Sequence, residues 1–355
     1  MSAATALDIP VTAPRVTATL EQTHVTFQAT PSTNPLFAYR LAIPKAWAYS
    51  AAFGPVPDGP FATQGLGFMT GSARPGAPVV AVTVTPLPFE IPVDTWARLS
   101  LAAEGWTIVA ARWFPGAKGL FFDITGTRTV NDVEEVRRTS VRVDGIHVFS
   151  VNCLSAREHW DEAKELFWVA HSTFHLVKPV GTTRMEPWLA ASADRPPSFV
   201  LAYPTSWSAS PVEKAPEGVS GLDVRLLDAK EETLLAYLQV QAVALDEGEA
   251  VPSFEALTAK GMKRLTAAGF QAAAPLKPLD TGEDPRAAAV EGWLGGLSGT
   301  GRLAAAEVIA RLGFVLRGRT VATFLSFSPR LEDDTLVALR TQRAFEIARA
   351  TFELD

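Results

Sequence analysis

The chain has 355 residues, of which 47% are hydrophobic and 20% are charged, and it contains 20 Phe and 9 Trp. This composition excludes a disordered chain, and the length allows two domains that each bury a core. The 32 Lys and Arg residues against 38 Asp and Glu residues leave a formal net charge of −6. Because nucleic-acid affinity depends on clustered basic residues, and no Lys/Arg-rich run occurs, the sequence disfavours nucleic-acid binding.

The N-terminal residues bear on the cellular compartment, and the single cysteine bears on disulfide formation. Residues 1–13 lack the basic start and continuous apolar stretch of a secretory signal, and no window offers about 20 uninterrupted apolar residues. We therefore expect a cytoplasmic protein with no transmembrane segment. Residues 1–15, rich in Ala, Thr and Pro, are expected to be a disordered tail. Cys153 is the one cysteine, which excludes an internal disulfide, and its apolar neighbours predict a buried strand thiol.

An internal repeat organises the rest of the chain. Leu41–Trp47 (LAIPKAW) matches Leu201–Trp207 (LAYPTSW), and each reads as a strand that ends in a proline turn followed by a Trp. A later strand start, Gly145–Phe149, matches Gly318–Ala322. These matches occur in the same order and at similar spacing, which indicates two copies of one folding unit.

Two helices complete each copy. The first is expected to begin at Asp94 or Ser253 and to end at Gly105 or Gly269, since Asp and Ser favour N-caps and Gly favours the position after a helix. The closing helix and the aromatic residue that follows it form the strongest match, in which Phe167–Leu176 aligns with Phe345–Leu354.

Between the two helices of each copy, alternating apolar and polar residues predict consecutive strands, which is typical of an antiparallel sheet. The predicted fold class is α+β, with two tandem copies of a domain in which helices pack on an antiparallel sheet. The first domain is expected over residues 16–178 and the second over 197–355. Residues 179–196, rich in Gly, Thr and Pro, are expected to be a linker.

The order of these features resembles the PsbP/Mog-like superfamily. The features are a strand with a Pro-x-x-Trp turn, a helix followed by a meander of strands, and a closing helix followed by an aromatic residue. Within this superfamily, the chain is closest in kind to DcrB-like proteins and to the Eag-type chaperones of type VI secretion effectors. The resemblance implies a non-enzymatic, protein-binding role as a bacterial chaperone or adaptor that holds an apolar or amphipathic segment of a secreted effector. A single chain would then carry a pseudo-dimeric pair of domains. The alternative role is an accessory or scaffold subunit of a larger complex.

Catalytic and metal-binding alternatives are weaker. His171 and His175 have the i, i+4 spacing of a zinc site, and a third ligand would have to come from Glu158, Asp161 or Glu162. The second copy has Arg349 and Glu353 at these positions, so a polar helix end is the simpler interpretation.

Two further motifs have a structural interpretation that is simpler than the catalytic one. Cys153 with His147 or His159 could form a thiol nucleophile and its base, although an apolar strand is a poor setting for a thiolate. Gly295–Gly301 lacks the Lys-Ser/Thr of a phosphate-binding loop and reads as a turn. We therefore predict no catalytic residue, no cofactor and no metal.

Aromatic residues are concentrated in the first copy. Some of them are expected to form an exposed apolar patch, which would mark a protein-binding surface. The predicted partner-binding residues are Trp106, Trp113, Phe114, Phe122 and Trp168.

Overall fold

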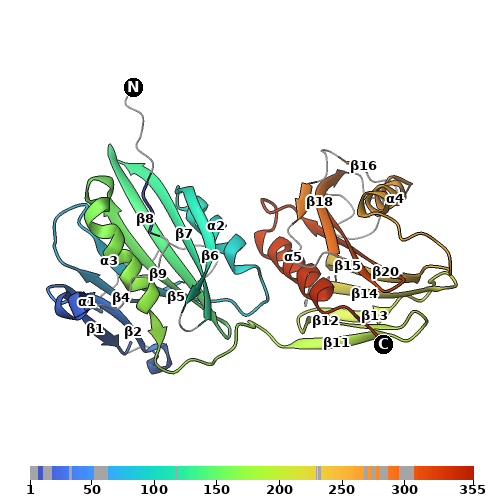
Figure 1. The fold of residues 1–355 in the computed structure, drawn as a ribbon, viewed down its shortest axis with the longest axis horizontal. Helices are drawn as coiled ribbons and strands as arrows, with labels where there is room; N and C mark the ends of the chain where they lie inside the picture. The colour runs from blue at the N-terminus through green and yellow to red at the C-terminus, as the bar shows by residue number, and fades with distance from the viewer. Residues whose placement is uncertain are drawn as a thin grey trace. The chain divides into compact units, whose positions relative to one another are not determined.

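The fold is described from a computed structural model (Figure 1). It describes residues 7–10, 18–31, 34–51, 63–116, 119–228, 230, 233–267, 271–272, 277–279, 287–295 and 308–355. The chain divides into two compact units. The first comprises residues 1–88 and 93–185, and the second comprises residues 89–92 and 186–355.

The first unit has a seven-stranded antiparallel sheet, a three-stranded sheet and two long helices. Its helical elements are α1 (Ala18–Thr23), η1 (Pro35–Phe37), α2 (Val93–Ala103), η2 (Arg157–His159) and α3 (Trp160–Thr173). Its strands are β1 (His24–Ala29), β2 (Tyr39–Pro44), β3 (Ala48–Ser50), β4 (Gln64–Thr70), β5 (Val79–Pro86), β6 (Thr107–Gly116), β7 (Gly119–Val130), β8 (Val133–Asp144), β9 (His147–Ala156) and β10 (His175–Leu176). The large sheet has the order β3-β4-β5-β9-β8-β7-β6, and the small sheet has the order β1-β2-β10.

The two long helices of the first unit cover opposite faces of the large sheet. Phe121 of β7 contacts Trp168 of α3, whereas the guanidinium of Arg98 in α2 lies over the ring of Phe122. Since consecutive strand residues point to opposite faces, one face belongs to α3 and the other to α2. The main core of the unit lies on the α3 face, where apolar residues of β2, β5 and β9 pack against the helix.

The second unit contains α4 (Phe254–Ala267) and α5 (Thr335–Ala350). Its strands are β11 (Trp188–Ala193), β12 (Phe199–Pro204), β13 (Ser208–Pro211), β14 (Val219–Leu227), β15 (Leu234–Ala244), β16 (Gln271–Ala272), β17 (Lys277–Leu279), β18 (Ala287–Gly295), β19 (Val308–Arg317), β20 (Thr320–Pro329) and β21 (Glu353–Leu354). The large sheet has the order β13-β14-β15-β20-β19-β18-β16, with β17 also paired to β18, and the small sheet has the order β11-β12-β21.

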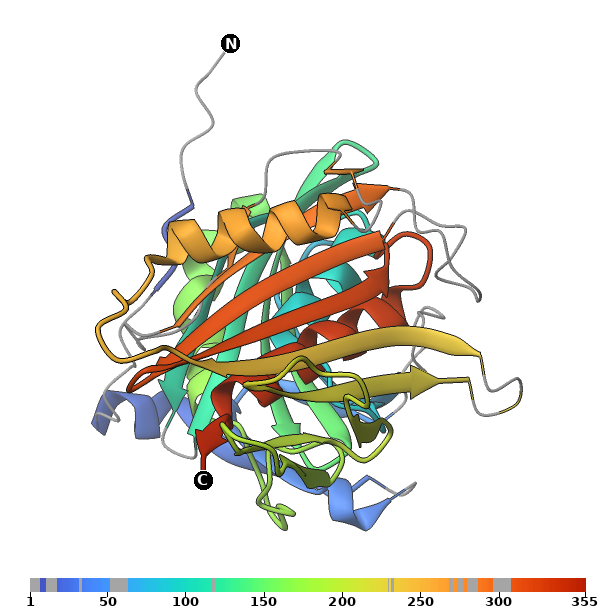
Figure 2. The same ribbon diagram turned by 90° about the vertical axis from the view of Figure 1, so that its right-hand side faces the viewer.

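The helices of the second unit also lie on opposite faces of its sheet, as Figure 2 shows. Leu312 of β19 packs against Gly261 of α4, and Gly313 packs against Phe345 of α5. A Cβ atom on Gly313 would lie 2.7 Å from the Phe345 ring, so this close approach of helix and sheet requires glycine.

The two units repeat one topology, in which the place of β6 beside β7 is taken by the two short strands β16 and β17 beside β18. This repetition confirms the predicted α+β class and the duplication. The matched proline turns have the same geometry, because the backbone N–H of Trp47 donates to Pro44 and that of Trp207 donates to Pro204, both at 3.0 Å. The strand β11 lies within the range expected to be a linker, and it pairs with β12 as β1 pairs with β2.

Three of the predicted helix ends can be compared with the structure. Ser253 caps α4, since its hydroxyl accepts from the N–H of Ala256 at 3.2 Å. Gly105 follows α2 with a φ of +81°, the left-handed conformation that favours glycine after a helix. Asp94 lies inside the first turn of α2 rather than before it, because the helix begins at Val93. Gly269 lies outside the described residues. None of the described helices is long and apolar enough to cross a membrane.

Candidate functional site

The five aromatic residues predicted to bind a partner do not form one exposed patch. On the α2 face, Trp106 and Phe122 are 4% and 1% exposed, and Trp168 of α3 is fully buried. Phe114 is half-buried and packs edge-on against Trp168, with ring centroids 4.7 Å apart. Trp113 is 48% exposed and is the one exposed member of the five. The patch fails to form because β6 and β7 direct neighbouring residues to opposite faces of the sheet. A contact between Trp113 and a partner stays a prediction.

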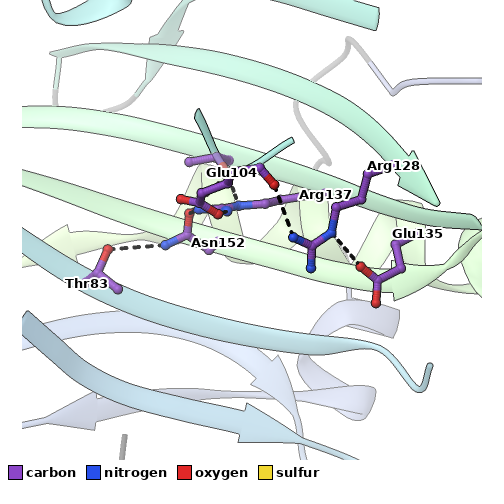
Figure 3. Close-up of polar contacts among 7 residues, drawn as sticks. Thr83, Glu104, Arg128, Glu135, Arg137 and Asn152 are labelled. Carbon is purple, nitrogen blue, oxygen red and sulfur yellow. Dashed lines mark hydrogen bonds and ion pairs between the residues drawn. The ribbon is translucent and has the colours of Figure 1, made fainter. Parts of the chain in front are cut away.

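A network of polar contacts joins the four strands β5, β7, β8 and β9 to the end of α2 on the α2 face (Figure 3). Arg137 of β8 forms an ion pair with Glu104, and its Nη2 donates to Oδ1 of Asn152 in β9 at 2.8 Å. Its Nε donates to the hydroxyl of Thr139 at 3.2 Å. The amide of Asn152 donates in turn to the hydroxyl of Thr83 in β5 at 3.2 Å. These contacts hold the strands in register with the helix.

Two arginines of this network cover the ring of Trp106. The guanidinium carbons of Arg128 and Arg137 lie 4.3 and 5.8 Å from its centroid. Arg128 also donates from Nε to Glu135 at 2.8 Å. Burial lowers the pKa of Arg137, and its ion pair with Glu104 opposes that shift. Because each arginine already has a carboxylate partner, we interpret the role of this network as structural. It covers the buried ring of Trp106.

The α3 face contains a buried group of charged and polar side chains. Asp123 accepts hydrogen bonds from Nε and Nη2 of Arg138 at 2.9 and 2.8 Å and from Arg112 at 3.0 Å. Burial alone would raise the pKa of Asp123, but the hydrogen bond and charge of Arg138 lower it below its ordinary value. His171 lies beside this pair with its Nδ1 2.7 Å from the hydroxyl of Ser140. Burial lowers the pKa of His171 to about 3, so its imidazole is neutral.

The structure separates the groups of the thiol hypothesis. Cys153 is fully buried, as predicted, and burial raises the pKa of its thiol, which is the opposite of what a nucleophilic cysteine requires. His147 begins the same strand six residues earlier, a separation of about 20 Å along an extended chain. His159 lies in η2, before α3.

The histidines considered for zinc do not share a helical face. His171 is in α3, but the helix ends at Thr173 and His175 belongs to β10. Among the described residues, no group of three or more His, Cys, Asp or Glu side chains could hold a metal ion. Of the glycine-rich segment, residues 296–301 lie outside the described part of the chain.

Residues Leu7–Pro10, which fall in the range expected to be a tail, lie against the α3 face of the first unit. Leu7 and Ile9 pack against the core, and Asp8 between them is exposed. This alternation of inward apolar and outward polar residues is typical of an extended segment on a half-buried surface.

Side chains from α3, β6 and β8 bind the backbone of this segment and the carboxylate of Asp8. The carbonyl oxygen of Asp8 accepts from the indole N–H of Trp160 at 3.0 Å, and its carboxylate accepts from Lys164 at 2.7 Å. The carbonyl oxygen of Pro10 accepts from Nη2 of both arginines of the charged group, Arg112 at 2.9 Å and Arg138 at 2.8 Å. We call Arg112, Arg138, Trp160 and Lys164 the segment-binding site.

Sequence reasoning missed this site. The alternating pattern Leu7-Asp8-Ile9-Pro10 was a usable signal for an extended segment, but four residues are too few to distinguish it from a tail. Nothing local to Trp160 or Arg112 indicates that a segment from the other end of the domain reaches them.

No protein family and no curated protein matches this chain. Among solved structures, it is similar to the solution structure of cyanobacterial PsbP (CyanoP) from Synechocystis sp. PCC 6803, with 14% identity and a TM-score of 0.34 over 47% of this chain and 98% of that chain. It is also similar to the apo structure of the type VI secretion immunity protein TplEi from Pseudomonas aeruginosa, with 8% identity and a TM-score of 0.22 over 94% and 98% of the two chains. The Tle4–Tli4 complex matches with 9% identity and a TM-score of 0.22 over 93% and 99%. These similarities are too remote to assign a function, which has to be argued from the chain's own geometry.

Proposed function

We propose that the chain is a non-enzymatic protein-binding module whose first unit holds an extended apolar segment of another protein. The observation that supports this proposal is the capture of the Pro10 carbonyl by both Arg112 and Arg138 while Leu7 and Ile9 pack against the core. Contacts to backbone carbonyls do not depend on the sequence of the held segment, whereas alternate apolar side chains select for hydrophobicity. The same side chains can therefore receive a foreign segment with the same pattern.

The chain's own segment would act as a covalently attached competitor. A tethered ligand has an effective concentration of about millimolar, so a foreign segment has to bind well to displace it. In the absence of a partner, residues 7–10 would keep the apolar surface of the site covered, which limits non-specific association.

The proposal assigns no catalytic residue. Burial keeps the Cys153 thiol and the His171 imidazole neutral, which supports structural roles for both. In its finer form, which rests on the resemblance to Eag-type chaperones, the held segment belongs to a secreted effector and binding takes place in the cytoplasm.

A peptide-binding measurement tests the proposal. A fluorescent peptide of residues 4–13 is titrated into a variant that lacks residues 1–13, and we expect saturable binding. The full-length chain should bind the same peptide at least tenfold more weakly, because its own segment competes. A control peptide with Leu7→Asp and Ile9→Asp should not bind.

Variants identify the site. Arg112→Met should weaken peptide binding to the truncated chain, whereas Arg225→Met, an arginine of the second unit, is the matched control and should leave it unchanged. A folded truncated chain that fails to bind the peptide would refute the proposal. Failure of the truncated chain to fold would equally refute it, since residues 7–10 would then be an integral part of the core.

A further inference from the structure

The first unit contains a cavity of about 450 Å³ beyond the end of α3, away from the side chains that hold residues 7–10. It is bounded by β2, β10, the β8–β9 hairpin and the chain over residues 177–183. Its size is in the range of small-molecule pockets, which is about 300–1,000 Å³. The lining residues that matter here are Arg40, Arg142, Phe149, Phe174, His175 and Leu176.

Arg142 is a half-buried cation that forms no ion pair among the described residues. Its Nη2 donates to the carbonyl oxygen of His171 at 3.1 Å, and its Nε is buried without a hydrogen-bond partner. The guanidinium lies 4.8 Å from the ring centroid of Phe121 and 5.7 Å from that of Phe174. Burial lowers its pKa to about 10, and no carboxylate offsets this shift. At neutral pH the cavity therefore contains a partly desolvated positive charge that an anion would stabilise.

Arg40 supplies a second positive charge to the same cavity. It is the cross-strand partner of His175, and its Nε donates to Gln28 at 2.7 Å. Asp144 is the one acidic residue in the described lining, and its two carboxylate oxygens accept from the N–H groups of Val180 and Gly181, each at 2.8 Å. The acidic group is thus engaged with the backbone rather than with either arginine.

The second unit shows that the fold does not require these charges. Arg40 pairs with His175 as Val200 pairs with Glu353, so Val200 occupies the position of Arg40 in the repeat. In the β8–β9 and β19–β20 hairpins, the position of Arg142 is occupied by Val315, which is 1% exposed and belongs to the core. The second copy has a buried valine at this position, whereas the first has an arginine that lines a cavity.

We propose that this cavity binds a small organic carboxylate with an aromatic or branched apolar body. The carboxylate would accept from the guanidinium groups of Arg142 and Arg40, which both line the cavity, because a guanidinium fork matches the two oxygens of a carboxylate. The apolar body would pack against Phe149, Phe174 and Leu176, which explains why apolar walls surround the charge. This inference does not depend on the proposed function, since it involves different residues and a different kind of ligand.

Calorimetric titration of the full-length chain with three probes tests the inference. We expect 3-phenylpropionate to bind and 3-phenylpropionamide, its neutral analogue, to bind at least tenfold more weakly. Inorganic phosphate, which lacks the apolar body, should also bind at least tenfold more weakly. Arg142→Met should reduce the affinity for 3-phenylpropionate at least tenfold, whereas Arg225→Met should leave it unchanged.

Three outcomes would overturn the inference. They are equal affinity for the acid and the amide, equal affinity for phosphate and 3-phenylpropionate, and absence of acid binding at about 10 mM, a concentration that detects even millimolar affinity. If Arg142→Met fails to fold, the comparison of acid with amide on the unmodified chain decides the question, because it needs no variant.

Discussion

The hydroxyl oxygen of Thr173 accepts a hydrogen bond from the backbone N–H of Ala42 at 2.8 Å, and Thr351 makes the same contact with Ala202 at 2.9 Å in the second unit. The strand β10 begins at His175, opposite Arg40 of β2, and pairs with residues 39 and 40, so it does not reach Ala42. The threonine at the end of the closing helix supplies the acceptor that a longer strand would have supplied. This contact is a side-chain feature that both copies of the repeat have kept.

Replacing Thr173 with Val should lower the free energy of unfolding by about 1–3 kcal/mol, because the N–H of the buried Ala42 would lose its acceptor. Thr173→Ser keeps the hydroxyl and should recover most of the loss. Urea denaturation measures the stability, and amide hydrogen exchange at Ala42 reports the local effect. Equal stability and equal protection in the Val variant and the unmodified chain would show that the hydrogen bond is dispensable.

Asp123→Leu should destabilise the first unit by about 3–5 kcal/mol, because it leaves Arg138, which is fully buried, without its carboxylate. The double variant Asp123→Leu/Arg138→Met should recover much of this loss, since it removes both buried charges. As a control, Arg330→Ala breaks an exposed ion pair with Glu332 and should cost less than about 1 kcal/mol. The measurement is urea denaturation, and a double variant as unstable as the single one would contradict the ion-pair interpretation.

The stability of the first unit should fall as the pH drops below the ordinary pKa of histidine, 6.5, because of His171. In the folded chain its pKa is about 3, so below pH 6.5 the unfolded chain takes up a proton that the folded chain does not. This group's contribution is fully present above pH 6.5 and declines toward pH 3, with a loss of about 2 kcal/mol at pH 5. His171→Asn should remove this component, which is measured as a smaller difference in free energy of unfolding between pH 7.5 and pH 5. Identical differences in the two proteins would contradict the assignment.

Trp106 directly precedes the edge strand β6, and Trp113 lies within it, so the two tryptophans form a matched pair. Trp106→Ala should cost about 3–5 kcal/mol, because the ring is buried beneath Arg128 and Arg137. Trp113→Ser should cost about 1 kcal/mol or less, because the side chain is about half exposed. Thermal unfolding of the two variants checks the difference. Comparable losses would mean that Trp113 belongs to the core, and the prediction that it contacts a partner would then lose its structural basis.

The duplication, the α+β class and several local features could be predicted from the sequence. The turns after Pro44 and Pro204, the cap at Ser253 and the glycine after α2 follow from local chemistry, since turn and cap residues act within a few positions along the chain. The closing helices were predictable for the same reason, because their apolar periodicity is visible in a short window.

Contacts between residues of distant segments could not be predicted from the sequence, because they depend on how the strands and helices pack. The position of Leu7–Pro10 depends on Trp160, about 150 residues later, and that contact leaves no mark on the local pattern of either segment. The same holds for Arg142 and Val315, which occupy equivalent places in two strands with similar patterns, although Arg142 lines a cavity and Val315 belongs to the buried core. Strand pairing and helix packing bring together side chains that are remote in sequence, so the candidate sites became visible only when the sheets were assembled.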